Sequence, residues 1–148
     1  MQVYPSDYGV SLDFQQIVNF IKSKTTHERI IDLLEDIYPI DDFDEIKLRL
    51  LETEELANLL KQGGFPNFSF IDLTKPLQLL NKEGAVLLEE QVLSVRRSSV
   101  IVNELLDFFE QNPGYENLGR NFHMVYFTNT IVKEIDKIID IHGLVKTS

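Results

Sequence analysis

The sequence has no cysteine and no tryptophan, and only seven glycines and five prolines interrupt its 148 residues. Without cysteine the chain forms no disulfide framework and no thiolate metal site, which fits a reducing compartment. No segment approaches the roughly 20 uninterrupted apolar residues that a membrane-spanning helix needs. Basic residues are scarce as well, 14 against 24 acidic ones, so the formal net charge is −10. We expect such an acidic chain to be repelled by nucleic acid rather than attracted to it.

Hydrophobic residues make up 43% of the chain, enough to exclude disorder and to build one core. The first residues, Met1 to Asp7, lack the basic flank and apolar run of a secretory signal peptide. We therefore expect a cytoplasmic protein without contact to a membrane. Residues 1–148 contain no internal repeat, low-complexity run or linker, which predicts a single all-helical domain.

Apolar residues recur with the helical period along most of the chain, which predicts an all-α fold. Ser11 is expected to cap the first helix, and Thr25 with Glu28 forms a capping-box pattern that opens the second. Tyr38-Pro39 ends the second helix, because proline disfavours helical geometry in the residue before it.

Residues that typically start or end helices predict the remaining helices. A third helix starts near Asp41 or Asp42 and ends before Gly63-Gly64, since glycine commonly follows a helix end. Further helices are predicted over 74–81, around 118–125, and through Ile131, Ile135, Ile138 and Ile139. The tail 140–145 reads as a turn that enters a short extended segment.

The clearest periodicity is a heptad-like seam of about six turns. Its members alternate in steps of four and three: Leu88, Val92, Val95, Ser99, Val102, Leu106 and Phe109. The seam predicts a long strut helix over about 88–110, ended by Asn112-Pro113-Gly114. We expect an irregular bundle of about six or seven helices around this strut, with a short extended segment at the C-terminus.

No motif predicts catalysis, and we expect no catalytic, cofactor-binding or metal-binding residue in this chain. The only glycine pair, at 63–64, is not followed by the lysine of a phosphate-binding loop. His27, His123 and His142 lie far apart and outside the spacings of helical metal sites. Ser99 lacks a nucleophile elbow and lies on the apolar seam, where a small residue permits close helix approach.

Two groups of residues are the candidate partner contacts. Arg96 and Arg97 form the one basic doublet in a long helix, suited to a phosphate contact or, in so acidic a chain, to a salt bridge with a neighbouring helix. Phe65, Phe68 and Phe70 form an aromatic loop. Such a loop can offer a partner pocket, and more commonly it folds back to cover helix ends, because aromatic side chains bury a large area.

The order of several short motifs resembles the start of a MutS-family ATPase. The likeness is greatest to the branch that lacks the mismatch-reading and connector domains and begins directly with the helical core. The motifs cover nearly the whole chain in the right order: Leu12-x-Phe14-x-x-Ile17, Asp42-Phe43-Asp44-Glu45-Ile46, Leu51-Glu52-Thr53-Glu54-Glu55, Leu59 to Pro66, Ile71-Asp72-Leu73, Lys82 to Leu87, and Ile135-Asp136-x-x-Ile139-Asp140-x-x-Gly143-x-Val145-x-x-Ser148.

The resemblance implies that the chain is a fragment from the start of the core and lever region of a longer protein. The parent would be a homodimeric ATPase with ATP and Mg, in many members with a C-terminal Smr nuclease domain, acting on DNA or ribosomes. The partners of this fragment would be the remaining domains of the parent chain. Neither the ATPase motifs nor the Gly-x-Phe-x-Glu mismatch wedge occurs in these residues, so the resemblance transfers no ligand-contacting residue.

Together these observations predict a non-catalytic helical core segment that couples the ATPase domain to the DNA clamp in DNA repair or recombination control. ATP binding elsewhere would shift the packed helices as rigid bodies, with the strut helix transmitting the movement. The alternative is a free-standing acidic helical module that binds a protein partner through the Phe65–Phe70 loop or a helical groove. A third hypothesis is a small helical enzyme, but no residues show the spacing of a known catalytic motif.

Overall fold

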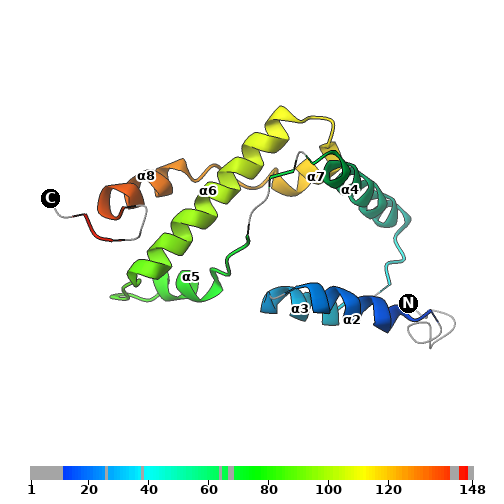
Figure 1. The fold of residues 1–148 in the computed structure, drawn as a ribbon, viewed down its shortest axis with the longest axis horizontal. Coiled ribbons are helices and arrows are strands. Elements are labelled where there is room, and N and C mark those ends of the chain that lie inside the picture. The colour runs from blue at the N-terminus through cyan, green and yellow to red at the C-terminus, as the bar shows by residue number, and fades with distance from the viewer. Residues whose placement is uncertain are drawn as a thin grey trace. The chain divides into compact units, whose positions relative to one another are not determined.

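The computed structural model describes residues 12–25, 27–37, 39–63, 65–66, 69–140 and 144–146. Within these ranges the fold is all-α and contains no β-sheet, as the periodicity predicted. The helices are α2 (Phe14–Lys24), α3 (Glu28–Glu35), α4 (Phe43–Gln62), α5 (Thr74–Leu80), α6 (Glu89–Gln111), α7 (Glu116–Gly119), the 3-10 helix η1 (Arg120–Phe122) and α8 (Asn129–Ile138) (Figure 1). No described helix is both long and apolar enough to cross a membrane.

The chain divides into two compact units, Met1–Leu48 and Arg49–Ser148, with the boundary inside the continuous helix α4. The first unit contains the pair α2 and α3. The second contains most of α4 and everything that follows it. The single domain over 1–148 that we expected, as a fragment of a longer protein, stays a prediction.

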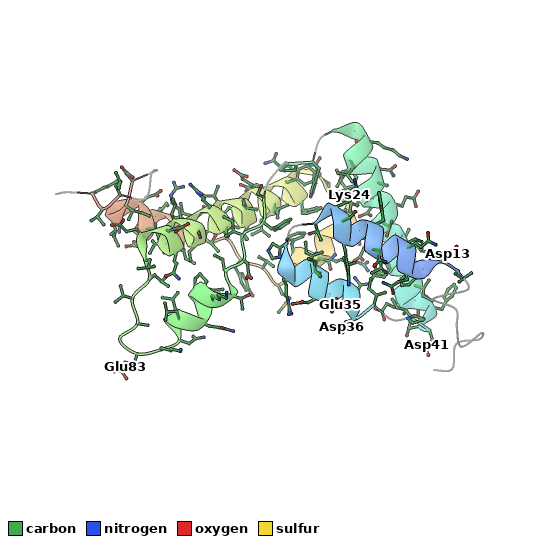
Figure 2. All side chains as sticks on the ribbon, turned by 60° about the horizontal axis from the view of Figure 1, so that its bottom comes forward. Asp13, Lys24, Glu35, Asp36, Asp41 and Glu83 are labelled. Atoms are coloured by element: carbon green, nitrogen blue, oxygen red, sulfur yellow. The ribbon has the colours of Figure 1, made fainter. Side chains whose placement is uncertain are left out.

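The first unit is a pair of amphipathic helices that pack against each other. Val18 of α2 is its buried residue, at 5% exposure, and Lys22 forms a 2.9 Å ion pair with Glu35 at the end of α3. Figure 2 shows Asp13 and Lys24 at the two ends of α2. Asp13 adopts a positive φ of 52° and its carboxylate accepts a hydrogen bond from the side chain of Gln16. The predicted cap, Ser11, lies outside the described residues.

The prediction that Thr25 caps the second helix was wrong. Helix α3 begins at Glu28, and the residue before it, His27, stands at the N-cap position. The Thr25 hydroxyl accepts a hydrogen bond from the His27 N–H, two residues along the chain, at 3.3 Å. Threonine forms such local turns readily, and this turn competes with the cap geometry. The helix ends at Glu35, before the position at which Pro39 would stop it.

Both ends of α4 follow the predicted signals. The Asp42 carboxylate accepts a hydrogen bond from the Glu45 N–H at 3.0 Å, which is the N-cap interaction. Asp44 and Glu45 lie in the first turn, where the helix dipole favours negative charge. Gly63 follows the last helical residue with φ +69°, a left-handed conformation that glycine adopts without a steric penalty.

Helix α6 is the predicted strut. It has 23 residues, and the side chain of Gln91 accepts a hydrogen bond from the Leu88 N–H at its start. At its end the Asn112 side chain donates to the Phe108 carbonyl at 2.7 Å. The buried residues of α6 are Ser99, Asn103, Leu105 and Leu106. Leu88, the first residue of the predicted seam, is 70% exposed, and the buried residues of the helix begin at Ser99.

The C-terminal elements also match the predictions, with shifted boundaries. The short helix predicted around 118–125 is the pair α7 and η1, which starts two residues earlier, at Glu116. Helix α8 ends at Ile138, and Ile139 forms an antiparallel β-bridge with Val145. Lys146 N–H donates to the Ile138 carbonyl at 2.8 Å, which gives the short extended segment.

Candidate functional site: two polar joints and an apolar groove

Helix α6 is joined to α8 by an ion pair with bidentate geometry. The Arg96 guanidinium donates from Nε to Oδ1 and from Nη2 to Oδ2 of Asp136, 40 residues later in the chain. This hydrogen bond lowers the pKa of the Asp136 carboxyl and raises that of Arg96. A planar guanidinium facing a carboxylate in this way fixes orientation as well as distance. The two helices are therefore held in one register.

A buried polar cluster reinforces this joint one to two turns further along α6. Asn103, only 8% exposed, accepts a hydrogen bond from the N–H of Thr128 at 2.7 Å, and its amide donates to the Asn129 side chain at 3.0 Å. The Thr128 hydroxyl shares its one hydrogen between the Ser99 carbonyl, at 2.9 Å, and the Asn103 side-chain oxygen, at 3.0 Å. The start of α8 is thus anchored on α6. We call this cluster, with the Arg96–Asp136 pair, the α6–α8 joint.

A second joint connects α4 to α7. The carboxylate of Glu55 on α4 accepts hydrogen bonds from the N–H of Asn117, at 3.2 Å, and of Leu118, at 2.9 Å. It also accepts one from the Asn117 side chain, at 2.5 Å. These N–H groups belong to the first turn of α7 and have no partner within the helix. A carboxylate from α4 thus caps α7, 62 residues later in the sequence. One turn earlier on α4, Glu52 accepts a hydrogen bond from the Asn121 side chain at 3.0 Å. These contacts form the α4–α7 joint.

The same contacts set the protonation of Glu55. Partial burial raises the pKa of this carboxyl, because it disfavours the charged form. The hydrogen bonds from Leu118 and Asn117, with the charge of Arg120, outweigh burial and leave the pKa below its ordinary value. The group is therefore held as a carboxylate at neutral pH.

Aromatic side chains join the C-terminal end of α6 to its surroundings. The Phe108 ring contacts Phe65 edge to face, with centroids 5.7 Å apart, and stacks on Tyr115 at 6.5 Å. On the next residue of the helix, the Phe109 ring stacks on Phe122 of η1 at 4.8 Å. The Tyr115 hydroxyl in turn donates to Gln62, the last residue of α4, at 3.1 Å. The end of α6 is thereby tied to the end of α4 and to η1.

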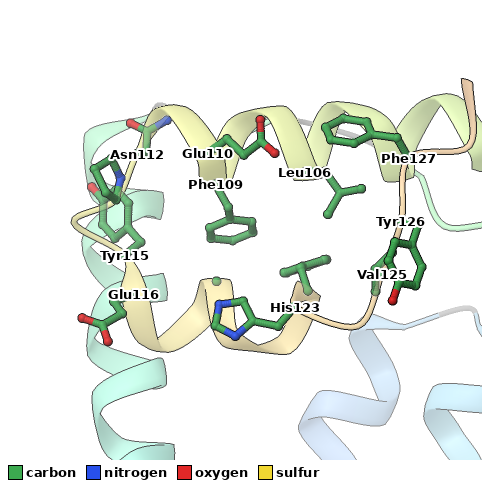
Figure 3. Close-up of a pocket in the computed structure, with 13 residues that line it drawn as sticks. Leu106, Phe109, Glu110, Asn112, Tyr115, Glu116, His123, Val125, Tyr126 and Phe127 are labelled. Atoms are coloured by element: carbon green, nitrogen blue, oxygen red, sulfur yellow. The ribbon is translucent and has the colours of Figure 1, made fainter.

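Beside this cluster lies an open, mostly apolar groove of about 520 Å³, which we call the α6 groove (Figure 3). One wall is the last two turns of α6 and the other is formed by α7, η1 and the segment after them. Its lining residues are Leu106, Phe109, Glu110, Asn112, Pro113, Tyr115, Glu116, Gly119, Phe122, His123, Val125, Tyr126 and Phe127.

The structure places the five candidate contact residues in different environments. Arg96 is engaged by Asp136, which is the salt bridge to a neighbouring helix that the sequence favoured, whereas Arg97 is exposed. Phe65 is half-buried against Phe108, so this part of the aromatic loop covers a helix end as expected. Phe70 is 65% exposed, and Phe68 lies outside the described residues. Their role as partner contacts stays a prediction.

Sequence reasoning identified Arg96 but missed the other side chains that form the joints, among them Asn103 and Glu55. Asn103 carried a signal, because it lies four residues after Ser99, on the inner face of a helix whose other buried members are small or apolar. Glu55 carried none, since it belongs to an acidic run that reads as a solvated helix face. Among the described residues no group of three or more His, Cys, Asp or Glu could hold a metal ion. His142 lies outside them.

Comparison with known proteins finds several relatives named "Endonuclease MutS2". The protein from Staphylococcus epidermidis is 22% identical over 139 residues, which is 90% of this chain and 18% of that protein. One from Clostridium botulinum is 29% identical over 133 residues, 87% of this chain and 17% of the relative. The protein from Staphylococcus haemolyticus is 23% identical over 140 residues, again 90% and 18%.

These matches confirm the resemblance to a MutS-family segment across about nine-tenths of the chain. The chain spans less than a fifth of the length of the curated relatives it matches. No family model matches it, and no solved structure matches it.

Proposed function

We propose that this chain acts as a non-catalytic coupling segment of a MutS-like ATPase, carrying movement between an ATPase domain and a DNA clamp. The distant likeness to MutS2 proteins over most of the chain supports the MutS-like context. We infer a role in DNA metabolism only from the name of those relatives, "Endonuclease MutS2". Control of DNA repair or recombination in the cytoplasm is the setting in which the segment would work.

Helix α6 is attached to α8 in its first half and to the end of α4 at its last turn, and this is the main structural support for the proposal. From Glu89 to Gln111 the helix is about 33 Å long at 1.5 Å per residue. The α6–α8 joint holds α6 between Arg96 and Asn103, and the aromatic cluster holds its last turn against the end of α4. A displacement applied at α8 would therefore reach α4 through α6 and these contacts.

The chemistry of the joints suits transmission. Bidentate ion pairs and buried amide networks have one good geometry, so helices joined by them move together or separate abruptly rather than sliding. Packed elements of this kind convert small shifts at one site into rigid-body movements at another. An apolar contact of the same area would tolerate more sliding, because hydrophobic burial is not directional.

The negative net charge of the segment limits which ligands it can bind directly. With a net charge of −10, and with Arg96 occupied by Asp136, the segment offers little to a phosphate backbone. We infer that DNA or a ribosome, ATP and Mg are bound by other parts of a homodimeric parent. This segment would support those parts mechanically and hold no cofactor.

The test uses the full-length protein that contains this segment, with Arg96→Ala compared with Arg97→Ala. Both changes remove one arginine from the same helix, but only Arg96 takes part in a joint. We expect Arg96→Ala to reduce the stimulation of ATP hydrolysis by DNA several-fold while hydrolysis without DNA is unchanged, and Arg97→Ala to leave both unchanged. Equal stimulation in the two folded variants would contradict the coupling role.

A further inference from the structure

The segment that follows η1 exposes four large apolar residues in succession. Met124 is 83% exposed, Tyr126 77%, Phe127 42% and Val125 38%. Three of the four line the α6 groove, as Figure 3 shows for Val125, Tyr126 and Phe127. Contiguous apolar surface of this kind marks an interaction site more often than scattered exposed residues do.

Hydrogen bonds hold this segment in its exposed position. Val125 N–H donates to the Phe122 carbonyl at 2.9 Å, and Thr128 N–H donates to the buried Asn103 side chain at 2.7 Å. The backbone is thus fixed on both sides of Tyr126 and Phe127. A preformed apolar wall loses little entropy when a ligand packs on it, which favours binding.

The charges of the groove select its ligand. The lining residues include two carboxylates, Glu110 and Glu116, and no lysine or arginine. Glu116 pairs with Arg120 at 3.3 Å, and Glu110 has no ion-pair partner among the described residues. Asp107 is exposed on α6 one turn before Glu110. An apolar ligand with basic flanks complements this rim, whereas a second copy of a chain with net charge −10 would be repelled.

The length of the groove fits a helix. Its lining residues on α6 run from Leu106 to Glu110, about 6 Å along the helix axis, and Asn112 and Pro113 extend the wall beyond the helix end. On an amphipathic helix, anchors at i and i+3 or i+4 cover a similar distance. The volume of about 520 Å³ is in the range of pockets that accept several large side chains.

We propose that the α6 groove binds an amphipathic helix of a partner protein, with large apolar anchors on one face and lysine or arginine at its flanks. The apolar anchors pack between Phe109 and the wall of Val125, Tyr126 and Phe127. A basic flank pairs with Glu110. This inference does not depend on the coupling role, because it uses neither joint as a transmitting element.

Three synthetic helical peptides of about 18 residues test the proposal by fluorescence anisotropy with the full 148-residue chain. The first has a leucine and phenylalanine face with lysine flanks. The second has the same face with glutamate flanks, and the third keeps the lysines but replaces the apolar face by alanine and serine. We expect the first to bind at least about tenfold more tightly than either of the others, since both apolar burial and charge contribute.

Variants of the chain locate the binding. Tyr126 and Glu110 are both exposed, so Tyr126→Asp and Glu110→Lys should leave the fold intact. Each substitution is expected to lower the affinity for the first peptide about three- to tenfold. The matched controls are Leu88→Asp, which alters a similarly exposed apolar residue at the other end of α6, and Glu104→Lys, which makes the same charge change away from the groove. Both controls are expected to bind as the wild type does. Circular dichroism confirms that every variant is folded.

The proposal is overturned if the first peptide fails to bind, or if the second or third binds equally well. It is also overturned if Tyr126→Asp and Glu110→Lys bind like the controls. Dimerisation of the chain that Tyr126→Asp abolishes would make a second copy the occupant instead. Sedimentation velocity at the concentrations of the titration distinguishes that outcome.

Discussion

Replacing Glu55 tests whether α4 really caps α7. Glu55→Ala removes the acceptor of three hydrogen bonds and leaves the N–H groups of Asn117 and Leu118 without a protein partner. A net hydrogen bond to a charged group is worth about 1.5–3 kcal/mol, and a charge at a helix N-terminus about 0.3–1 kcal/mol. Because Glu55 is only half-buried, water replaces part of what is lost, so we expect a decrease of about 1–2 kcal/mol in the unfolding free energy.

Urea denaturation at pH 7, followed by circular dichroism, measures this loss. The matched control is Glu54→Ala, an exposed neighbour on the same helix, for which we expect a change within about 0.5 kcal/mol. Glu55→Gln keeps one acceptor oxygen but loses the charge, and should fall between the two. Amide exchange gives the local readout, because the N–H groups of Asn117 and Leu118 should exchange about 5- to 30-fold faster in Glu55→Ala.

The pH dependence has a definite sign. The pKa of Glu55 is lower in the folded chain than its ordinary value of 4.5, so its contribution is fully present above that value. The contribution disappears as the pH falls through the lower, folded pKa. The gap between wild type and Glu55→Ala should therefore be constant near neutrality and narrow as the pH falls below 4.5, through the lower pKa of the folded chain. A gap no larger than that of Glu54→Ala at pH 7, with unchanged exchange at Asn117 and Leu118, would refute the capping role.

Three other substitutions test the remaining packing. Asn103→Ala should cost about 2–3 kcal/mol in urea denaturation, because it leaves the buried polar groups of the α6–α8 joint unpaired; a loss under about 0.5 kcal/mol would contradict the network. Leu59→Ala, at a residue only 2% exposed, should cost about 2–4 kcal/mol, whereas Leu60→Ala, 63% exposed, should cost well under half of that; equal losses would place α4 in a different rotation. Gly63→Ala should lower the free energy of unfolding in urea by about 1 kcal/mol, because Gly63 has a φ of +69° that alanine adopts only with strain. Gly114→Ala, without a positive φ and with open space around it, should change the free energy of unfolding little.

The helices could be predicted because their signals are local. The seam from Leu88 to Phe109, the Asp42 cap and the Gly63 stop each depend on residues within a few positions of one another. The error at Thr25 arose where two local patterns competed, since the same hydroxyl can cap a helix or close a turn. Only the backbone geometry around His27 decides between them.

The joints could be predicted only in part, because they depend on residues far apart in the sequence. The sequence showed that Arg96 would find an acid on a neighbouring helix, but nothing in it singled out Asp136 among 24 acidic residues. The start of α7 at Glu116 is set by Glu55, 61 positions earlier, through hydrogen bonds that no local pattern encodes. The α6 groove, by contrast, is lined only by residues between Leu106 and Phe127, so it forms within one continuous stretch of the chain that turns back at 112–115.

In the coupling role that we propose, α6 ties α4 and α8 into one rigid element. Because the chain has no cysteine, Asn58→Cys on α4 and Lys133→Cys on α8 provide two unique, exposed sites for spin labels. Double electron–electron resonance between these labels should give one narrow distance distribution, which broadens when Arg96→Ala opens the α6–α8 joint and stays narrow with Arg97→Ala. A broad or multiple distribution with both joints intact would show that α4 and α8 move independently, and α6 could not then transmit movement between them.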